Sequence, residues 1–290
     1  MSDLMKNAKL AAKTHPDHRT VIALSPTVTV GGSELLIVGG PCAVENADQM
    51  EAVASRLAIA PVQALRGGVY KPRTSPYSFQ GLGETGLQIL AQVRDRYGMP
   101  VITEVMAISQ IEAIARYADV LQVGSRNMQN FDLLKALGQV QKPVVLKRGL
   151  AATLEEFIMA AEYILSHGNP NVILCERGIR SFDTYTRNVL DLGAVVALKQ
   201  LTHLPVIVDP SHAAGKRELI ANLAKAAIAA GADGVMIECH PHPEQSVSDA
   251  RQALSLDEMA SLAETLEAIA IAVGRTIPAG VGSMPPLSLV

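Results

Sequence analysis

The sequence predicts a (β/α)₈ barrel with a short N-terminal β-hairpin, on three observations. Eight short apolar runs recur along the 290 residues, and most of them precede a helical pattern. The runs are continuous rather than alternating, which indicates strands buried on both faces and therefore a parallel sheet. Eight such units over about 240 residues match the length of one barrel. A doubly wound open sheet is the alternative, but it more often carries G-x-G-x-x-G after its first strand, and the sequence lacks that motif.

The expected strands and helices follow one another along the chain. Strands are predicted at residues 35–38, 62–65, 101–103, 120–123, 144–146, 172–174, 206–208 and 234–237. Helices are predicted at residues 47–58, 84–97, 109–117, 131–137, 154–166, 189–201, 218–230 and 256–273. Their apolar residues fall at i, i+3 and i+4, which is the spacing of one helical face. Expected N-caps are Asn46, Thr153 and Ser255, and Gly98 and Gly168 are expected to end helices.

The chain divides into three parts. Residues 1–19 form a charged N-terminal arm, residues 20–275 form the barrel with its hairpin, and residues 276–290 form an irregular tail rich in Gly and Pro. The hairpin is predicted from two short runs, residues 20–24 and 27–30, which are separated by Ser-Pro and followed by Gly-Gly. We expect it to cover the N-terminal mouth of the barrel.

Composition excludes several classes of function. A net charge of −3 gives no general attraction to nucleic acid or to anionic membranes. Aromatic residues are only 3% of the chain and Trp is absent, which argues against platforms for stacking bases. No apolar run approaches the roughly 20 residues that span a bilayer. The three cysteines form neither a disulfide framework nor a C-x-x-C pair, so we expect a cytoplasmic, reducing setting.

Four residues with metal-binding side chains stand at or near the ends of predicted strands. Cys42 follows the first strand in G-G-P-C, His212 follows the seventh in D-P-S-H, and Glu238 ends the eighth, with Asp249 eleven residues later. A thiolate, an imidazole and two carboxylates suit Mn²⁺, Fe²⁺, Co²⁺ or Zn²⁺. Calcium and magnesium rarely accept sulfur. The other two cysteines are expected to serve packing.

Cations follow most of the remaining strands. Because the carboxyl ends of barrel strands surround one mouth, we expect these side chains to converge there. The cations are Arg66, Lys71, Arg73, Arg126, Lys147 and Arg177. Crowded like charges repel, so the arrangement needs anions to stabilise it, and six cations suit about two phosphates and one carboxylate. Acidic groups join them at the mouth: we expect Glu104 to pair with a cation, and Glu176 to lie beside Arg177.

Seven segments together resemble one enzyme family. They are G-G-P-C-A-V-E (39–45), L-R-G-G-V-Y-K-P-R-T-S-P-Y-S-F-Q-G (65–81), V-G-S-R-N-M-Q-N (123–130), L-K-R-G (146–149), C-E-R-G-I-R (175–180), D-P-S-H-A-A-G (209–215) and E-C-H-P with the following S-D. They resemble 3-deoxy-D-arabino-heptulosonate 7-phosphate (DAHP) synthases of the type I-beta branch. This resemblance covers about residues 20–275 and implies a metal-dependent barrel enzyme that condenses phosphoenolpyruvate with erythrose 4-phosphate, at the entry to the shikimate pathway.

The resemblance also implies roles for individual residues. The implied metal ligands are Cys42, His212, Glu238 and Asp249. The implied phosphoenolpyruvate contacts are Arg66, Lys71, Arg126, Lys147 and Arg177, with the backbone near Ser125. The implied erythrose 4-phosphate contacts are Lys71, Pro72, Arg73, Thr74 and Asp249. On this reading the metal polarises the aldehyde and Lys71 protonates the developing alkoxide. The base that activates water stays open among a metal-bound water, His212 and Glu104.

Two rival functions remain at this point. The sister family, 3-deoxy-D-manno-octulosonate 8-phosphate synthase, uses arabinose 5-phosphate and characteristically has K-A-N-R-S where this chain has K-P-R-T-S at residues 71–75. An inactive barrel that serves as a scaffold or regulatory subunit is the other rival, although a scaffold would not need the metal and cation sets. The resemblance further implies a homotetramer. With only short segments outside the barrel, we expect a barrel-only form without a built-in inhibitor domain. A separate chorismate mutase partner and an effector pocket between protomers are the two other routes to feedback inhibition.

Overall fold

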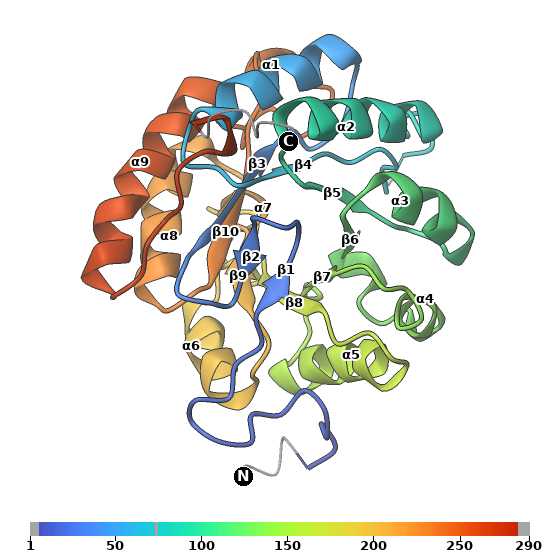
Figure 1. The fold of residues 1–290 in the computed structure, drawn as a ribbon, viewed down its shortest axis with the longest axis vertical. Helices are drawn as coiled ribbons and strands as arrows, with labels where there is room; N and C mark the ends of the chain where they lie inside the picture. Colours follow the sequence, from blue (N-terminus) through green and yellow to red (C-terminus); the bar gives the residue numbers. More distant parts are fainter. Residues whose placement is uncertain (1–5, 73–74, 284–290) are drawn as a thin grey trace, which may run out of the picture.

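Eight parallel strands close into a barrel, and helices cover its outside (Figure 1). The computed structural model describes residues 6–72 and 75–283. The strands are β3 (Leu36–Gly40), β4 (Ala64–Arg66), β5 (Val101–Glu104), β6 (Val120–Val123), β7 (Val144–Lys147), β8 (Val172–Glu176), β9 (Val206–Val208) and β10 (Gly234–Glu238). Neighbouring strands pair in parallel in chain order, and β10 closes the ring against β3 over five residue pairs. The predicted fold class is confirmed, and the doubly wound alternative is wrong.

The helices fall close to their predicted positions. They are α1 (Ala47–Ala58), α2 (Glu84–Tyr97), α3 (Ile111–Tyr117), α4 (Phe131–Leu137), α5 (Leu154–Ser166), α6 (Leu192–Leu201), α7 (Pro210–Ala214), α8 (Arg217–Ala229) and α9 (Leu256–Ala272). The three expected N-caps each accept a hydrogen bond from a backbone N–H of the first turn. Gly98 ends α2 in the left-handed conformation. Helix α5 ends at Ser166 as predicted, with His167 as its C-cap and Gly168, whose φ is 108°, directly after it.

Two helix starts differ from the prediction by two or more residues, for local reasons. Helix α6 begins at Leu192 rather than at residue 189, because the Asp191 side chain caps the amide of Ala194. Helix α3 begins at Ile111, after a 3₁₀ turn at Ile108–Gln110 that occupies the start of the predicted span. Helix α7 was not predicted, since five residues are too short to show a helical period.

The hairpin consists of β1 (Ile22–Ala23) and β2 (Thr29–Val30), which pair antiparallel. Its side chains Ile22, Leu24, Val28 and Val30 belong to the same apolar cluster as the residues that point into the barrel. Figure 1, viewed along the barrel, accordingly shows β1 and β2 in front of the ring of strands. The hairpin therefore fills one end of the barrel, and the opposite end remains for a site. Among the described residues, none of the helices combines the length and apolar content that crossing a membrane requires.

Candidate active site and metal centre

Side-chain alternation along the strands decides which polar groups enter the barrel. Successive residues of a strand point to opposite faces. The interior apolar cluster includes Ala64, Ile102, Val145, Cys175, Ile207 and Met236. Two residues after each of these comes a charged one: Arg66, Glu104, Lys147, Arg177, Asp209 and Glu238. The apolar layer inside the barrel thus continues into a layer of charges at the carboxyl ends of the strands.

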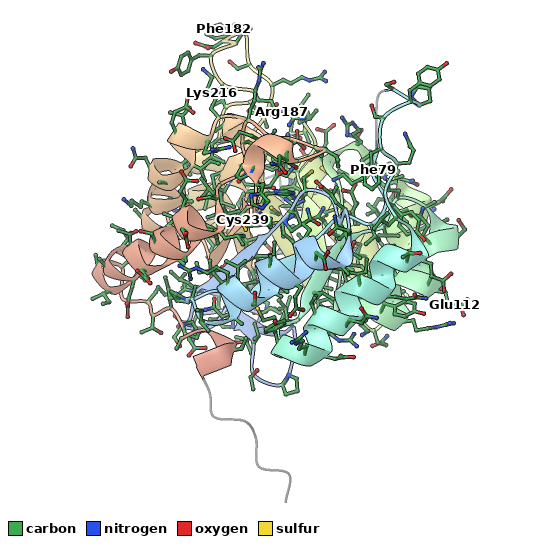
Figure 2. All side chains as sticks on the ribbon, turned by 90° about the horizontal axis from the view of Figure 1, so that it is seen from above. Phe79, Glu112, Phe182, Arg187, Lys216 and Cys239 are labelled. Carbon is green, nitrogen blue, oxygen red and sulfur yellow. The ribbon has the colours of Figure 1, made fainter. Side chains whose placement is uncertain are left out.

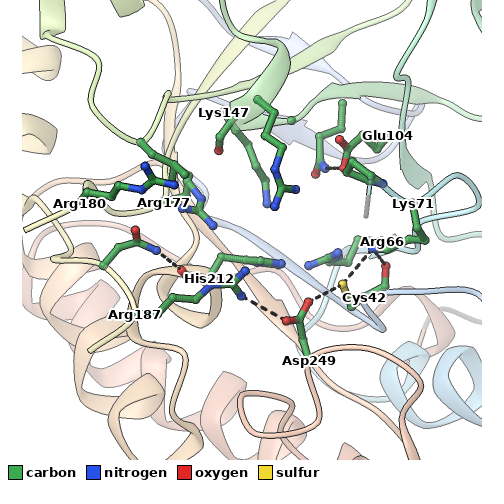
Figure 3. A pocket seen from close by; sticks show the side chains of 17 residues that line it. Cys42, Arg66, Lys71, Glu104, Lys147, Arg177, Arg180, Arg187, His212 and Asp249 are labelled. Carbon is green, nitrogen blue, oxygen red and sulfur yellow. Dashed lines mark hydrogen bonds and ion pairs between the residues drawn. The ribbon is translucent and has the colours of Figure 1, made fainter. Parts of the chain in front are cut away.

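These charges surround a cavity of about 470 Å³ (Figure 3). Its lining includes most residues of the sequence-predicted site: Cys42, Arg66, Lys71, Pro72, Ser125, Arg126, Lys147, Arg177, His212 and Asp249. Figure 3 shows Cys42 near Arg66 and Lys71 and Asp249 between Cys42 and Arg187, with Arg177 and Arg180 farther across the cavity. Arg73 and Thr74 lie outside the described residues. The structure therefore brings predicted cations and predicted metal ligands to one opening.

Cys42, His212, Glu238 and Asp249 form a compact cluster, and all of them except Glu238 line this cavity. Each offers one ligand atom, and these four atoms all lie within 4.8 Å of one another. The Cys42 thiol donates to Asp249 Oδ2 at 3.0 Å, and His212 Nε2 lies 3.7 Å from Glu238 Oε2. Four donors of mixed softness within this distance have the spacing from which one divalent transition-metal ion can be bound.

The buried carboxylate of Asp209 orients the imidazole of His212 from the side opposite the other three candidate ligands. Asp209 Oδ2 accepts a hydrogen bond from His212 Nδ1 at 2.7 Å, which leaves Nε2 to face the other three ligands. The same oxygen forms an ion pair with the ammonium of Lys147, and both side chains are buried. Asp209 also caps α7 through the amide of His212. The helix cap and the side-chain hydrogen bond from His212 to Asp209 together fix the orientation of the His212 imidazole on α7.

Burial shifts the pKa values of three members of the cluster toward the neutral form. It raises the pKa of the Cys42 thiol, and it raises the pKa of Glu238 to about 7 with a further contribution from Asp249. Burial also lowers the pKa of His212 to about 3, although Asp209 acts in the opposite direction. A neutral imidazole is the form that binds metal, and a divalent cation would replace the protons that the thiol and the carboxyl otherwise hold.

An unpaired buried atom supports the fit of a cation. Glu238 Oε2 accepts from Gln252 Nε2 at 2.8 Å, but Glu238 Oε1 is buried without a hydrogen-bond partner among the described residues. A buried carboxylate oxygen without a partner is costly, and a metal ion would satisfy it. The donor set and this orphaned oxygen together fit a divalent ion.

Two buried guanidinium groups have hydrogen-bond donors that an anion could satisfy. Arg66 and Arg177 are buried, and the Nη1 atom of each has no hydrogen-bond partner within the part of the chain that the structure describes. Lys71 is also buried, and its ammonium donates to the Cys42 carbonyl at 2.6 Å and contacts Cys42 Sγ at 2.9 Å. An anion with several oxygens would supply the missing acceptors for both arginines.

Two sequence expectations need correction. Glu176 points to the outer face of the barrel rather than to the mouth, because it lies an odd number of residues from the interior Cys175. There it pairs with the buried guanidinium of Arg148 at 2.9 Å. Glu104 does line the cavity, but its carboxylate accepts from the Gln122 amide at 3.4 Å and forms no ion pair within the described residues.

Sequence reasoning missed four lining residues with polar side chains: Gln122, Arg180, Arg187 and Asn188. Gln122 follows the interior Val120 by two positions, so strand alternation could have identified it. The other three belong to the long loop between β8 and α6, where no periodic signal indicates direction. Figure 2 shows this loop at one end of the molecule, with Phe182 at its tip and Arg187 and Lys216 nearby.

The fold and the site define a (β/α)₈ enzyme class that combines a candidate metal centre with a cavity lined by several cationic side chains. A model of the DAHP synthetase I family matches residues 14–274. The chain is 46% identical over 271 residues to a phospho-2-dehydro-3-deoxyheptonate aldolase of Thermotoga maritima, a match that covers 93% of this chain and 80% of the relative. A crystal structure of DAHP synthase from Thermotoga maritima superposes with a TM-score of 0.89 at 45% identity, covering 93% of this chain and 78% of that one.

The chain therefore belongs to the DAHP synthetase I family. Its resemblance to the sister enzymes is more distant: a 2-dehydro-3-deoxyphosphooctonate aldolase of Syntrophotalea carbinolica is 33% identical over 269 residues, 86% of this chain and 96% of the relative. The predicted family and enzyme class are confirmed, and the octulosonate alternative is not favoured.

Proposed function

We propose that the chain condenses phosphoenolpyruvate with erythrose 4-phosphate, giving 3-deoxy-D-arabino-heptulosonate 7-phosphate and phosphate. The observation that carries this proposal is the pair of buried, unpartnered guanidinium donors on Arg66 and Arg177, which lie beside a four-ligand metal cluster in the described part of the chain. Family membership supplies the reaction class. A phosphorylated carboxylate fits these donors because it offers acceptors in two groups.

The cavity divides between the two proposed substrates. Phosphoenolpyruvate is assigned to Arg66, Lys71, Arg126, Lys147 and Arg177, with the backbone at Ser125. Erythrose 4-phosphate is assigned to Lys71, Pro72, Arg73, Thr74 and Asp249. Lys71 and Asp249 both touch Cys42, so these assignments place the aldehyde beside the candidate metal centre.

In the proposed reaction, C3 of phosphoenolpyruvate attacks the aldehyde carbon and a new carbon–carbon bond forms. When bound, Mn²⁺, Fe²⁺, Co²⁺ or Zn²⁺ would supply Lewis acidity to the aldehyde oxygen. The ammonium of Lys71 donates a proton to that oxygen as it gains negative charge. Water then adds at C2 and loses a proton to a base, and the C2–oxygen bond to phosphate breaks as the remaining hydroxyl proton passes to the departing phosphate and C2 becomes the ketone carbon.

The contacts of His212 bear on the choice of base. Its Nδ1 is held by Asp209 and its Nε2 faces the other three ligands, so an imidazole that serves as a ligand has no free nitrogen to accept a proton. Glu104 lines the cavity with one hydrogen bond from Gln122, and its carboxylate can accept a proton from water. We therefore favour Glu104 over His212 as the base.

Phosphate release from phosphoenolpyruvate tests the function directly. We expect turnover with erythrose 4-phosphate and a far lower kcat/KM with arabinose 5-phosphate, measured in the same coupled assay. A higher kcat/KM with arabinose 5-phosphate would support the octulosonate reaction instead. Absence of turnover with either aldose, in a protein shown by calorimetry to bind phosphoenolpyruvate and manganese, would support the scaffold function.

Chelation tests the metal requirement. Removal of divalent ions should abolish turnover, and Mn²⁺, Co²⁺, Fe²⁺ or Zn²⁺ should restore it to different degrees. The variant Cys42→Ala should bind the ion weakly and show little activity at any metal concentration. Full activity of this variant after exhaustive chelation would contradict the assignment of Cys42.

We further propose that the chain is a cytoplasmic homotetramer. Several large apolar side chains on the outer surface support association, among them Ile59 at the end of α1 and Ile271 on α9, which are each about two-thirds exposed at 68% and 65%. Light scattering at micromolar concentration should give four times the chain mass. A fully active monomer would contradict this proposal.

A further inference from the structure

One arginine links the two carboxylates of the candidate metal cluster from outside it. Arg187 Nη1 donates to Asp249 Oδ1 at 3.2 Å and to Gln252 Oε1 at 3.3 Å. Gln252 is buried, and its amide Nε2 donates in turn to Glu238 Oε2 at 2.8 Å. A single guanidinium therefore contacts one carboxylate directly and the other through the Gln252 amide.

The backbone around Arg187 is fixed to the helix that carries the third ligand. The amide of Arg187 donates to the Ala214 carbonyl at 3.0 Å, and the amide of Asn188 donates to the Ala213 carbonyl at 2.8 Å. Asn188 Nδ2 also donates to the carbonyl of His212 at 3.0 Å. The end of the β8–α6 loop is thereby held against α7, which gives the Arg187 side chain a defined starting point.

Asp249 has a particular need for such a partner. It lies in a loop, outside the strands, and its φ of 57° places it in the left-handed region that non-glycine residues rarely adopt. A residue in this conformation persists where surrounding contacts determine it. Its carboxylate has three such contacts, from Cys42 Sγ, from Ser248 Oγ at 3.3 Å and from Arg187.

We propose that Arg187 and Gln252 are positioning residues that hold the carboxylates of Asp249 and Glu238 in the geometry a divalent ion requires. This inference rests on the proposed metal centre. Groups that orient metal ligands from outside typically contribute about 10- to 100-fold to metal affinity.

Charge repulsion alone predicts the opposite effect of removing Arg187 on metal affinity, so a binding measurement distinguishes the two explanations. An arginine beside a cation site repels the cation, so its removal should strengthen metal binding if charge alone matters. Removal of a positioning residue should weaken binding, because the carboxylate is then free to leave the required geometry. Arg180 provides the matched control, since it lies on the same loop and faces the same cavity without a hydrogen bond to the cluster among the described residues.

The experiment is a titration of Mn²⁺ into the chelator-stripped full chain without either substrate, with free Mn²⁺ followed by electron paramagnetic resonance. Variants are Arg187→Met, Arg187→Lys, Gln252→Met, the double variant Arg187→Met/Gln252→Met, and the control Arg180→Met. Circular dichroism of each stripped protein checks that it is folded. Since Arg187 is partly exposed, with 44% of its side chain accessible, its variants should fold.

We expect Arg187→Met and Gln252→Met each to weaken Mn²⁺ binding about 10-fold or more, with Arg187→Lys in between. The double variant should lose less than the product of the two single effects, because both residues act through one hydrogen-bonded chain. Arg180→Met should bind as tightly as the unmodified chain or more tightly.

Unchanged or tighter binding by Arg187→Met, matching Arg180→Met, would overturn the inference and leave the metal centre intact. A rise in Michaelis constants without a change in Mn²⁺ affinity would also overturn it, and would make Arg187 a substrate contact. If the unmodified chain bound no Mn²⁺, the proposed metal centre itself would fall, and this inference with it.

Discussion

Arg126 and Lys147 are both assigned to phosphoenolpyruvate, but their surroundings differ. Arg126 is exposed at the rim of the cavity, whereas Lys147 is buried against Asp209. Arg126→Ala should therefore raise the Michaelis constant for phosphoenolpyruvate roughly 10-fold or more, the effect of one charge-assisted hydrogen bond. Its unfolding temperature should not change.

Lys147→Ala should affect both quantities, because it leaves the buried Asp209 without its cation. Steady-state kinetics and thermal unfolding of the two variants separate these outcomes, with the exposed Lys135→Ala as control. Equal loss of stability in Arg126→Ala and Lys147→Ala would show that burial does not distinguish their roles.

At the scale of single residues, the sequence predicted most of the lining of the cavity. The reason is that strand ends in a barrel converge, so any polar residue just after an apolar run is a candidate. Asp209 follows a predicted strand but has no predicted role, because its bonds to Lys147 and His212 join side chains that are remote in the sequence or separated by a helical turn. Arg187 could not be predicted at all, since its direction depends on how a long loop packs against α7.

At the scale of elements, Gly40 shows how closely two strands approach at the site. Its φ is 142°, and a Cβ there would lie 2.1 Å from the carbonyl oxygen of Arg66. Gly40→Ala should therefore separate the end of β3 from β4 and displace both Cys42 and Arg66. Gly98→Ala is the control, because Gly98 also has a positive φ, at 69°, but a Cβ added there would meet no described atom within 4 Å.

We expect Gly98→Ala to cost about 1 to 2 kcal/mol of stability, the backbone penalty alone, with activity unchanged. Gly40→Ala should lose more stability and most of its activity. Urea denaturation and the phosphate-release assay would measure both. Similar losses in the two variants would show that the close approach of Gly40 to Arg66 is unimportant.

The outer face of β7 and β8 contains a buried ion network that the cavity does not use. Arg148 Nη1 donates to Glu176 at 2.9 Å and to Asp191, the N-cap of α6, at 3.0 Å. Arg148→Met should destabilise the fold by about 3 to 5 kcal/mol, because Glu176 is left buried without its cation. The double variant Arg148→Met/Glu176→Gln should recover part of this loss in denaturant unfolding. If the double variant were less stable than the single one, burial of the lone carboxylate could not be the cause.

Element boundaries were predicted well where a cap or a long apolar period marks them. Helices α1, α2, α4 and α5 begin and end at the predicted residues, and each presents an apolar face to the barrel. The start of α6 was misplaced because Val189 and Leu190 continue the apolar pattern, while Asp191 supplies the actual cap. Hydrophobic periodicity gives little information about the side-chain hydrogen bonds that compete with a helix.

At the scale of the whole molecule, the N-terminal arm is tied across the barrel's outer helices. The carboxylate of Glu162 on α5 accepts from the amides of Leu10 and Ala11 at 2.8 to 3.1 Å, and Ala8, Ala11 and Ala12 are buried in the main core. Glu162→Leu should release the arm and speed tryptic cleavage after Lys13. Glu155→Gln, an exposed change on the same helix, should not. Identical cleavage rates would show that the other contacts of the arm, such as the hydrogen bond from the Lys13 amide to the Leu201 carbonyl, hold it without Glu162.

The shared carboxylate of Asp209 has a consequence for how the two ligands influence each other. A metal ion on His212 Nε2 would draw electron density from the ring and strengthen the bond from Nδ1 to Asp209, which leaves Lys147 less neutralised and more attractive to an anion. Phosphoenolpyruvate and the metal should then bind with positive cooperativity. Thermodynamic reciprocity requires that each raise the affinity of the other by the same factor. The affinities for the metal and for phosphoenolpyruvate would thus be coupled through one oxygen atom of Asp209, without any movement of the barrel strands.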